Sequence, residues 1–194
     1  MIVTDLDSVE RALRAGEVVG LPTDTVYGVG VDPFHPGATD RLFAAKRRPR
    51  DVELPVLVAD AAQARLVATG ISDAVQQLME RFWPGALTIV LARVPDVAID
   101  LGGNAVTVGV RCPDHDAVRE LCRRVGPLAT TSANLHGQPT ATIAAEVEAL
   151  LGPSGVVLDG GTCTGSPSTV VDCTTPEPTL LREGRIPWTL ISRQ

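Results

Sequence analysis

Four cations stand within five positions of the chain: Lys46, Arg47, Arg48 and Arg50, separated only by Pro49. Arginine offers a rigid fork of donors to phosphate oxygens and lysine offers a point charge, so this loop could clamp a polyphosphate. A proline stiffens the loop, which lowers the entropy lost on binding. The alternative is a solvated loop whose cations favour the C-terminal end of a helix.

A strand expected over residues 105–111 has two unlike faces. One face carries valines that belong in a core: Val106, Val108 and Val110. The other carries a hydroxyl, a bare backbone and a guanidinium: Thr107, Gly109 and Arg111. At about 3.3 Å per residue, the hydroxyl and the guanidinium stand about 13 Å apart, which suits a nucleotide or an extended small ligand. The alternative is an exposed strand face with a surface arginine.

Neutral hydrogen-bonding groups gather at three other strand ends. They occur in LPTDTVYGVG (residues 21–30), TTSAN (130–134) and GSPSTVVD (165–172). Each stretch alone is typical of turns and caps. Together they indicate a site, because binding residues concentrate where loops leave a rigid scaffold.

The composition and the missing motifs narrow the classes of function. The net charge of -6 argues against a protein that coats nucleic acid, although it does not exclude a local anion site. No GxxxxGK[ST] loop, GxGxxG turn or GxSxG elbow occurs, so a nucleotide would have to be held by another device. The cysteines form no CxxC pair, which favours four reduced thiols over a zinc site: Cys112, Cys122, Cys163 and Cys173.

The expected elements place these groups on one sheet. Apolar spacing predicts helices over residues 8–15, 39–47, 72–85, 114–126 and 142–152, with Ser8 or Asp7 capping the first and Ser72 capping the third. Strands are expected over 17–23, 54–60, 86–94, 105–111, 128–134, 155–161, 168–174 and 179–184. Strands outnumber helices without alternating regularly. This favours an α/β (α+β) fold, one domain over residues 1–194 with a twisted mixed sheet and flanking helices.

No apolar run in the sequence approaches the roughly 20 residues of a membrane span. The first residues carry acids and no signal-peptide pattern. We therefore expect a cytoplasmic protein without a membrane partner.

Six segments of the chain resemble those of a known family. The segments GLPTDTVYGVG, AAKRRP, FWPGALTIVL, VTVGVRCPDH, TTSAN and GSPSTVVD…LLREG are similar in order and spacing to the YrdC/Sua5 family, from about residue 10 to about residue 188. Both the KxR pattern (Lys46, Arg48) and the SxN pattern (Ser132, Asn134) are intact. The resemblance implies the short, single-domain form of the family, with a deep, positively lined cavity.

The resemblance also implies an activity, L-threonylcarbamoyladenylate synthase, which is a nucleotidyltransferase. The substrates would be L-threonine, bicarbonate and ATP, with Mg²⁺ bound to the ATP and with pyrophosphate released. A carbamate of threonine would attack the α-phosphate, without a protein nucleophile. The product would pass to tRNA threonylcarbamoyl-transfer proteins that make t6A at adenosine 37.

By the same resemblance, L-threonine would be bound by Thr25, Arg111 and Ser168. ATP would be bound, or its pocket lined, by Lys46, Arg48, Thr107, Ser132, Asn134 and Arg182. Lys46 and Arg48 would be catalytic, because they would neutralise charge that grows on the phosphates.

Two positions depart from the family pattern. Arg47 stands where relatives have glycine, so we expect it to point to solvent, and Leu57 stands about where some relatives carry a histidine that contacts the amino acid. Two alternatives stay open. One is a paralogue of the same fold with a different nucleotide ligand, and the other is an RNA-binding module, for which weak RNA binding would be the sign.

Overall fold

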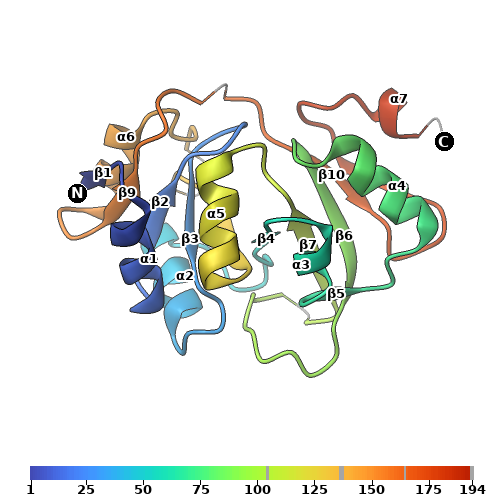
Figure 1. The fold of residues 1–194 in the computed structure, drawn as a ribbon, viewed down its shortest axis with the longest axis horizontal. Coiled ribbons are helices and arrows are strands. Elements are labelled where there is room, and N and C mark those ends of the chain that lie inside the picture. The colour runs from blue at the N-terminus through green and yellow to red at the C-terminus, as the bar shows by residue number, and fades with distance from the viewer. Residues whose placement is uncertain (104, 136–137, 164, 193–194) are drawn as a thin grey trace.

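Eleven strands form one mixed sheet in the computed structural model, which describes residues 1–103, 105–135, 138–163 and 165–192. The strand order is β1-β9-β2-β3-β8-β4-β7-β6-β10-β11, and β5 pairs with β6 outside this path (Figure 1). The strands are β1 Ile2–Val3, β2 Val19–Leu21, β3 Gly28–Val31, β4 Val56–Leu57, β5 Ala68–Thr69, β6 Leu87–Arg93, β7 Thr107–Arg111, β8 Leu128–Ser132, β9 Val156–Leu158, β10 Thr169–Asp172 and β11 Thr179–Arg182. The helices are α1 Leu6–Arg14, α2 Ala38–Lys46, α3 Ala61–Ala64, α4 Asp73–Phe82, α5 Asp116–Val125, α6 Ala144–Leu151 and α7 Trp188–Ile191.

The sheet is mixed, as the irregular element order predicted. β4 runs parallel to β7 and antiparallel to β8, while β6 runs antiparallel to β7 and parallel to β10. Two registers matter for the site. Leu57 of β4 pairs with Arg111 of β7, and Gly28 of β3 pairs with Ser132 of β8. Segments far apart in the sequence therefore meet in the middle of the sheet.

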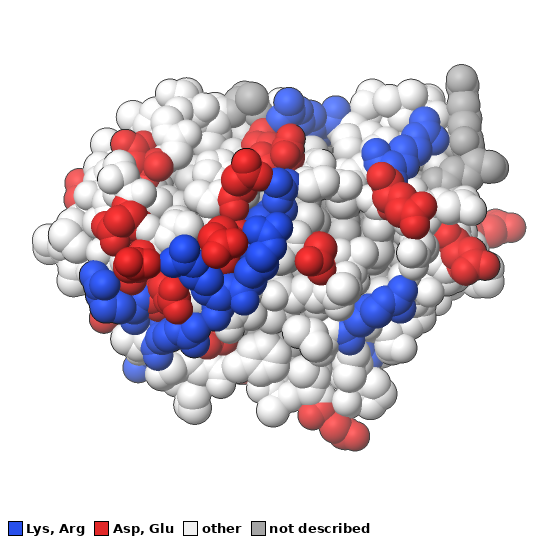
Figure 2. Space-filling view, viewed as in Figure 1, with Lys and Arg blue, Asp and Glu red and all other residues white. Residues whose placement is uncertain are grey.

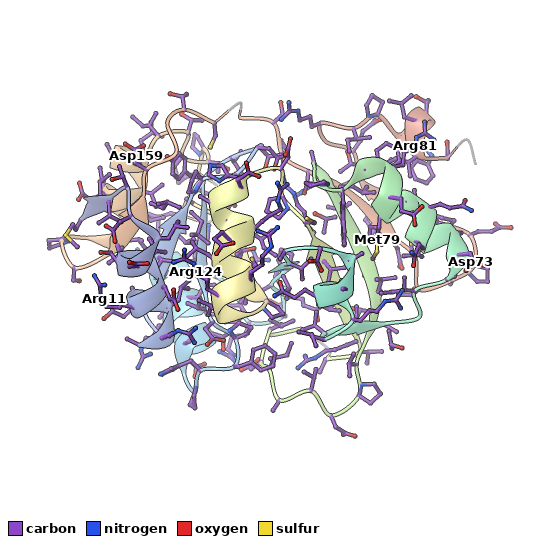
Figure 3. The ribbon with its side chains drawn as sticks, viewed as in Figure 1. Arg11, Asp73, Met79, Arg81, Arg124 and Asp159 are labelled. Carbon is purple, nitrogen blue, oxygen red and sulfur yellow. The ribbon has the colours of Figure 1, made fainter. Side chains whose placement is uncertain are left out.

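Helices cover both faces of the sheet. On one face α1 and α5 lie side by side, packed over β2, β9 and the ends of β4 and β8 through residues such as Leu13 and Leu121 (Figure 1). On the other, α2 and α6 belong to the larger core, which contains Phe43 and Val147. α4 joins that core through its inner face, where Met79 is buried, whereas Asp73 and Arg81 of the same helix are exposed (Figure 3).

Side chains cap the starts of three helices, α1, α3 and α4. Ser72 caps α4 as predicted, because its hydroxyl accepts a hydrogen bond from the Val75 amide (3.3 Å). The expected cap of α1 was wrong. Asp5 accepts from the Ser8 amide (2.8 Å), so the helix begins at Leu6 rather than at residue 8.

The faces of β7 are largely as the alternation predicted. Val108 and Val110 are fully buried in the larger core, while Gly109 and Arg111 line a cavity on the other face. The prediction for Val106 was wrong, because that side chain is 65% exposed. β7 begins at Thr107, so the alternation does not extend to the residue before it.

Charge on the face that carries α1 and α5 is mixed. Figure 2 shows basic and acidic side chains interleaved over these helices. Arg124 of α5 reaches toward α1 and pairs with Asp7 (2.9 Å) as well as with Glu120 (3.0 Å) (Figure 3). Within α1, Arg14 pairs with Glu10 (2.9 Å). The cations of this surface are therefore largely neutralised by neighbouring carboxylates.

In the part of the chain that the structure describes, no helix has the length and apolar character needed to cross a membrane.

Candidate functional site

A cavity of about 570 Å³ lies where the middle strands of the sheet meet the loops that follow β2 and β8. This volume is typical of small-molecule sites. Its described wall is rich in hydroxyls, including Thr23, Thr25, Thr88, Thr131, Ser132 and Ser168. Its charged wall residues are Arg48, Glu53, Arg111 and Arg182. Three arginines against one carboxylate give the cavity a positive character in a chain whose net charge is -6.

Arg111 is held at one end of the cavity. Its Nη2 donates to Asp24 Oδ1 (2.5 Å), its Nη1 donates to Thr25 Oγ1 (2.9 Å) and its Nε donates to the Gly85 carbonyl (2.9 Å). Asp24 also accepts from the Asp114 amide (3.1 Å). Burial lowers the pKa of Arg111 and the Asp24 carboxylate raises it. The guanidinium is thus fixed in direction and partly neutralised before any ligand arrives.

Ser168 and Arg182 form a second part of the wall. Arg182 Nη2 donates to the Ser168 carbonyl (2.9 Å), and the Ser168 hydroxyl lies 2.9 Å from that of Thr88. These contacts join β11 to the start of β10 and to β6. No described carboxylate lies within ion-pair distance of Arg182, so its charge is available to an anion.

Arg48 is the cavity cation supplied by the basic loop. Its guanidinium donates to neutral acceptors: the Val52 carbonyl (3.1 Å), the Glu53 carbonyl (3.1 Å) and Thr131 Oγ1 (3.4 Å). These bonds curl the loop back on itself and aim the side chain at β8. As for Arg182, none of the ion pairs in the described residues involves it. The loop therefore presents one oriented guanidinium that has no ion-pair partner among the described residues, although the charge of Asp51 acts on it.

Lys46 lies beside the cavity, at the end of α2, and is only 3% exposed. Its ammonium donates to the Ser132 carbonyl (2.5 Å), to Asn134 Oδ1 (2.6 Å) and to the Asn134 carbonyl. Burial, with a smaller contribution from Arg48, lowers its pKa to about 8. Lys46 thus fixes the end of β8 at Ser132, and it places a positive charge next to the cavity wall.

Asn134 and Thr107 also lie outside the wall. Asn134 accepts from Lys46 and from the Ser132 hydroxyl (2.7 Å), and it donates to the Gln138 carbonyl (2.6 Å). Thr107 donates to Glu53 Oε2 (3.1 Å). Of the nine residues that the family resemblance assigns to the substrates, six line the cavity: Thr25, Arg48, Arg111, Ser132, Ser168 and Arg182. The other three support residues of the wall.

The remaining cations of the loop face elsewhere. Arg47 is exposed, as expected, and adopts a left-handed backbone with φ 49°, a conformation that favours glycine. Arg50 pairs with Asp40 and Asp100 and covers the ring of Phe43 at 4.8 Å. The four cations therefore differ in position. Arg48 lines the cavity and Lys46 is buried beside it, whereas Arg47 faces solvent and Arg50 forms ion pairs at the surface.

Several wall residues were not assigned a role from the sequence, and two of them stand beside predicted site residues. Leu57 contributes an apolar patch next to Arg111, its partner on β7. Glu53 brings a carboxylate to the wall from the loop between α2 and β4. The only signal for Glu53 in the sequence was an acid close behind the basic loop, and its direction could not be known before the loop was folded.

Comparison with known proteins agrees with this geometry. The family model Sua5_yciO_yrdC, described as "Telomere recombination", matches residues 11–184. Threonylcarbamoyl-AMP synthase of Bacillus subtilis is 41% identical over 178 residues, which are 90% of this chain and 51% of that protein. A Mycobacterium tuberculosis relative is 40% identical over 177 residues, which are 90% of this chain and 82% of the relative.

Solved structures share the fold over the whole chain. P. abyssi Sua5 complexed with L-threonine superposes with a TM-score of 0.91 and 33% identity, covering 100% of this chain and 60% of that one. Escherichia coli YciO superposes with a TM-score of 0.83 at 23% identity, covering 95% of this chain and 94% of that one. From its sequence motifs, its cavity and these matches, the chain belongs to the Sua5/YciO/YrdC family.

Proposed function

We propose that this protein is an L-threonylcarbamoyladenylate synthase, which makes threonylcarbamoyl-AMP and pyrophosphate from L-threonine, bicarbonate and ATP. One observation carries the proposal. The cavity combines a fixed Arg111–Thr25 pair at one end with two arginines, Arg48 and Arg182, that lack a described carboxylate partner. The relative from B. subtilis bears the name of this activity, and P. abyssi Sua5 has been solved with L-threonine.

In this proposal Arg111 and Thr25 bind the carboxylate of L-threonine. The guanidinium is already oriented by Asp24 and Gly85, so little entropy is lost when the substrate docks. Ser168 lies across the cavity wall, within reach of Thr88, and offers a hydroxyl to the substrate side chain. The amine of threonine then takes up carbon dioxide derived from bicarbonate, and the resulting carbamate oxygen attacks the α-phosphate of ATP.

The phosphates of ATP would lie against Arg48, Arg182 and Ser132. Positioning and charge stabilisation suffice for this reaction, because the carbamate itself is the nucleophile. Arg48 and Arg182 stabilise the negative charge that develops as pyrophosphate leaves. Lys46 and Asn134 act on the phosphates through Ser132, whose carbonyl and hydroxyl they hold.

A metal ion enters this proposal with the nucleotide. Among the described residues no group of three His, Cys, Asp or Glu side chains could hold one. We therefore assign Mg²⁺ to the phosphates of ATP, where it would neutralise charge, and assign no step to it. The product would be consumed by tRNA threonylcarbamoyl-transfer proteins in the cytoplasm.

The RNA-binding alternative finds little support, since most basic residues of α1 and α5 are ion-paired. A paralogue with another nucleotide ligand is the stronger rival. Both are separated from the synthase by one experiment: incubation with ATP, L-threonine, bicarbonate and Mg²⁺, followed by mass spectrometry. We expect the threonylcarbamoyl adenylate in the complete mixture, and no carbamoyl adenylate of valine when L-threonine is replaced by L-valine, which lacks the hydroxyl. ATP consumption without this adenylate would disprove the proposal.

A further inference from the structure

Glu53 brings the one carboxylate to a cavity whose other described charged wall residues are arginines. It lies on the loop between α2 and β4, five residues after Arg48 and directly before a buried leucine. Its Oε2 accepts the hydroxyl hydrogen of Thr107 (3.1 Å), and its carbonyl accepts from Arg48 (3.1 Å). Thr107 thus holds one oxygen of the carboxylate and Arg48 holds the backbone of Glu53, yet nothing in the proposed reaction uses the carboxylate.

The bond to Glu53 limits what Thr107 can do. A threonine hydroxyl has a single hydrogen to donate. That hydrogen points to Glu53, so the Thr107 oxygen can only accept a further hydrogen bond. A phosphate oxygen needs a donor, and it is also repelled by a carboxylate a few ångströms away. The Glu53–Thr107 pair is therefore unsuited to phosphates and suited to a donor group.

The second carboxylate oxygen points to the same kind of partner. Glu53 Oε1 is enclosed and has no hydrogen-bond partner among the described residues. Burial raises the pKa of Glu53, while the Thr107 hydrogen bond and the charge of Arg93 lower it. An enclosed acceptor without a donor is costly. Because the terminal torsion of glutamate is broad, the carboxylate can turn this oxygen toward the cavity and meet a ligand donor there.

Glu53 lines the cavity, and Thr107 supports it from the far end of β7 relative to Arg111. Thr107 and Arg111 begin and end β7, four residues apart, which is about 13 Å along a strand. In the proposed reaction the α-phosphate of the nucleotide lies near the amino acid and the phosphates lie on the arginines. The nucleoside half of the nucleotide then lies elsewhere in the cavity. That half carries its only strong donors, the ribose hydroxyls and the exocyclic amine of the base.

From this geometry we infer that Glu53 and Thr107 form an acceptor-only subsite for the nucleoside half of the nucleotide, in which Glu53 determines specificity by accepting a hydrogen bond from a ribose hydroxyl or from the exocyclic amine. The inference rests on the proposed use of a nucleotide in this cavity. It sets the direction of the nucleotide, with phosphates on the arginines and the nucleoside at Glu53.

Direct binding measurements test this inference separately from turnover. Isothermal titration calorimetry would compare ATP, 2′-deoxy-ATP, 3′-deoxy-ATP, ITP and inorganic tripolyphosphate on the wild type and on Glu53→Ala, Glu53→Gln and Asp51→Asn. Asp51 is exposed on the same loop, so its substitution removes the same charge without touching the pair. Tripolyphosphate has no nucleoside half and reports the phosphate contacts alone.

We expect Glu53→Ala to weaken ATP binding about tenfold or more, the usual effect of losing a hydrogen bond to a charged group, and to leave tripolyphosphate binding no weaker. The wild type should discriminate against one of the three analogues, which identifies the donor, and Glu53→Ala should no longer discriminate against it. Glu53→Gln, which keeps the shape of the side chain and one acceptor oxygen, should show reduced discrimination. Asp51→Asn, which alters only a charge near Arg48, should discriminate among the analogues as the wild type does.

Three results would overturn the inference: equal weakening of ATP and tripolyphosphate, unchanged discrimination in Glu53→Gln, or tighter ATP binding by Glu53→Ala. If Glu53→Ala fails to fold, the isosteric Glu53→Gln decides alone. The predicted binding pattern without adenylate formation would disprove the synthase proposal and leave this subsite standing.

Discussion

Arg111 and Asp24 form an ion pair of 2.5 Å in which the two side chains are only 8% and 11% exposed. The pair joins β7 to the loop after β2 at the end of the cavity, and Thr25 and Gly85 complete the contacts of the guanidinium. An interior ion pair contributes less than its Coulomb energy, but breaking it leaves an uncompensated charge. The residue proposed to bind the substrate carboxylate is thus also part of the structure.

Arg111→Ala should therefore reduce stability as well as function. Because the removal breaks an interior ion pair with Asp24, we expect a loss of about 3–5 kcal/mol in the free energy of unfolding, measured by urea denaturation. Arg50→Ala is the matched control, since its ion pairs with Asp40 and Asp100 lie at the surface and should contribute about 1 kcal/mol or less. A loss below 1 kcal/mol for Arg111→Ala would show that the pair does not hold the loop.

The cations of residues 46–50 should differ in their effects on ATP. Arg48→Ala and Arg182→Ala each remove from the wall a guanidinium that has no ion-pair partner among the described residues, so each should weaken ATP binding about tenfold or more. Arg47→Gly should leave ATP binding nearly unchanged. It should also stabilise the fold by up to about 1 kcal/mol, since the left-handed conformation at φ 49° suits glycine. Equal, modest losses in the three variants would instead indicate diffuse electrostatic attraction.

Lys46 should make ATP binding sensitive to pH. Its pKa of about 8 means that the free protein loses this charge as pH rises through 8, whereas bound phosphates favour the protonated amine. ATP affinity should therefore be highest below pH 8 and fall above it, with proton uptake on binding near pH 8. The free energy of unfolding depends on pH in the opposite direction to ATP affinity. Between about pH 8 and the ordinary lysine pKa the unfolded chain binds more protons, so this group makes stability rise with pH.

Calorimetry in buffers of different ionisation enthalpy measures that proton uptake. A dissociation constant that is flat from pH 7 to pH 9.5 would mean that the Lys46 charge does not act on the nucleotide.

Val108 and Val106 offer a matched pair on either side of the start of β7. Val108 is fully buried in the larger core, so Val108→Ala should cost about 1–3 kcal/mol in the free energy of unfolding. Val106 is 65% exposed, and Val106→Ala should change stability by about 0.5 kcal/mol or less. Thermal melts monitored by circular dichroism would distinguish them, and similar losses at the two positions would contradict the observed strand boundary.

The irregular order of elements was enough to predict the mixed sheet. Periodicity was enough to predict which face of β7 carries Gly109 and Arg111, because alternation is fixed by strand geometry. It could not locate the end of a strand, and so Val106 was assigned to the core. Periodicity also could not predict the direction in which a long side chain points. Lys46 and Arg48 are two residues apart, yet the helix ends between them, and the first turns inward to Ser132 while the second turns to the cavity.

Glu53 was missed for a related reason. Its role depends on contact with Thr107, which is 54 residues away in the sequence, and on a loop whose path is set by the bonds of Arg48 to Val52 and Glu53. Local patterns do not encode such contacts. Cavity walls assembled from loops of different segments therefore become visible only once the chain is folded.

The central claim is that one cavity joins L-threonine, bicarbonate and ATP, and pyrophosphate release tests it most directly. In a coupled assay with Mg²⁺, we predict release that requires L-threonine and bicarbonate together and that Arg182→Ala reduces about tenfold or more. Pyrophosphate released at the same rate without L-threonine or without bicarbonate would contradict the account.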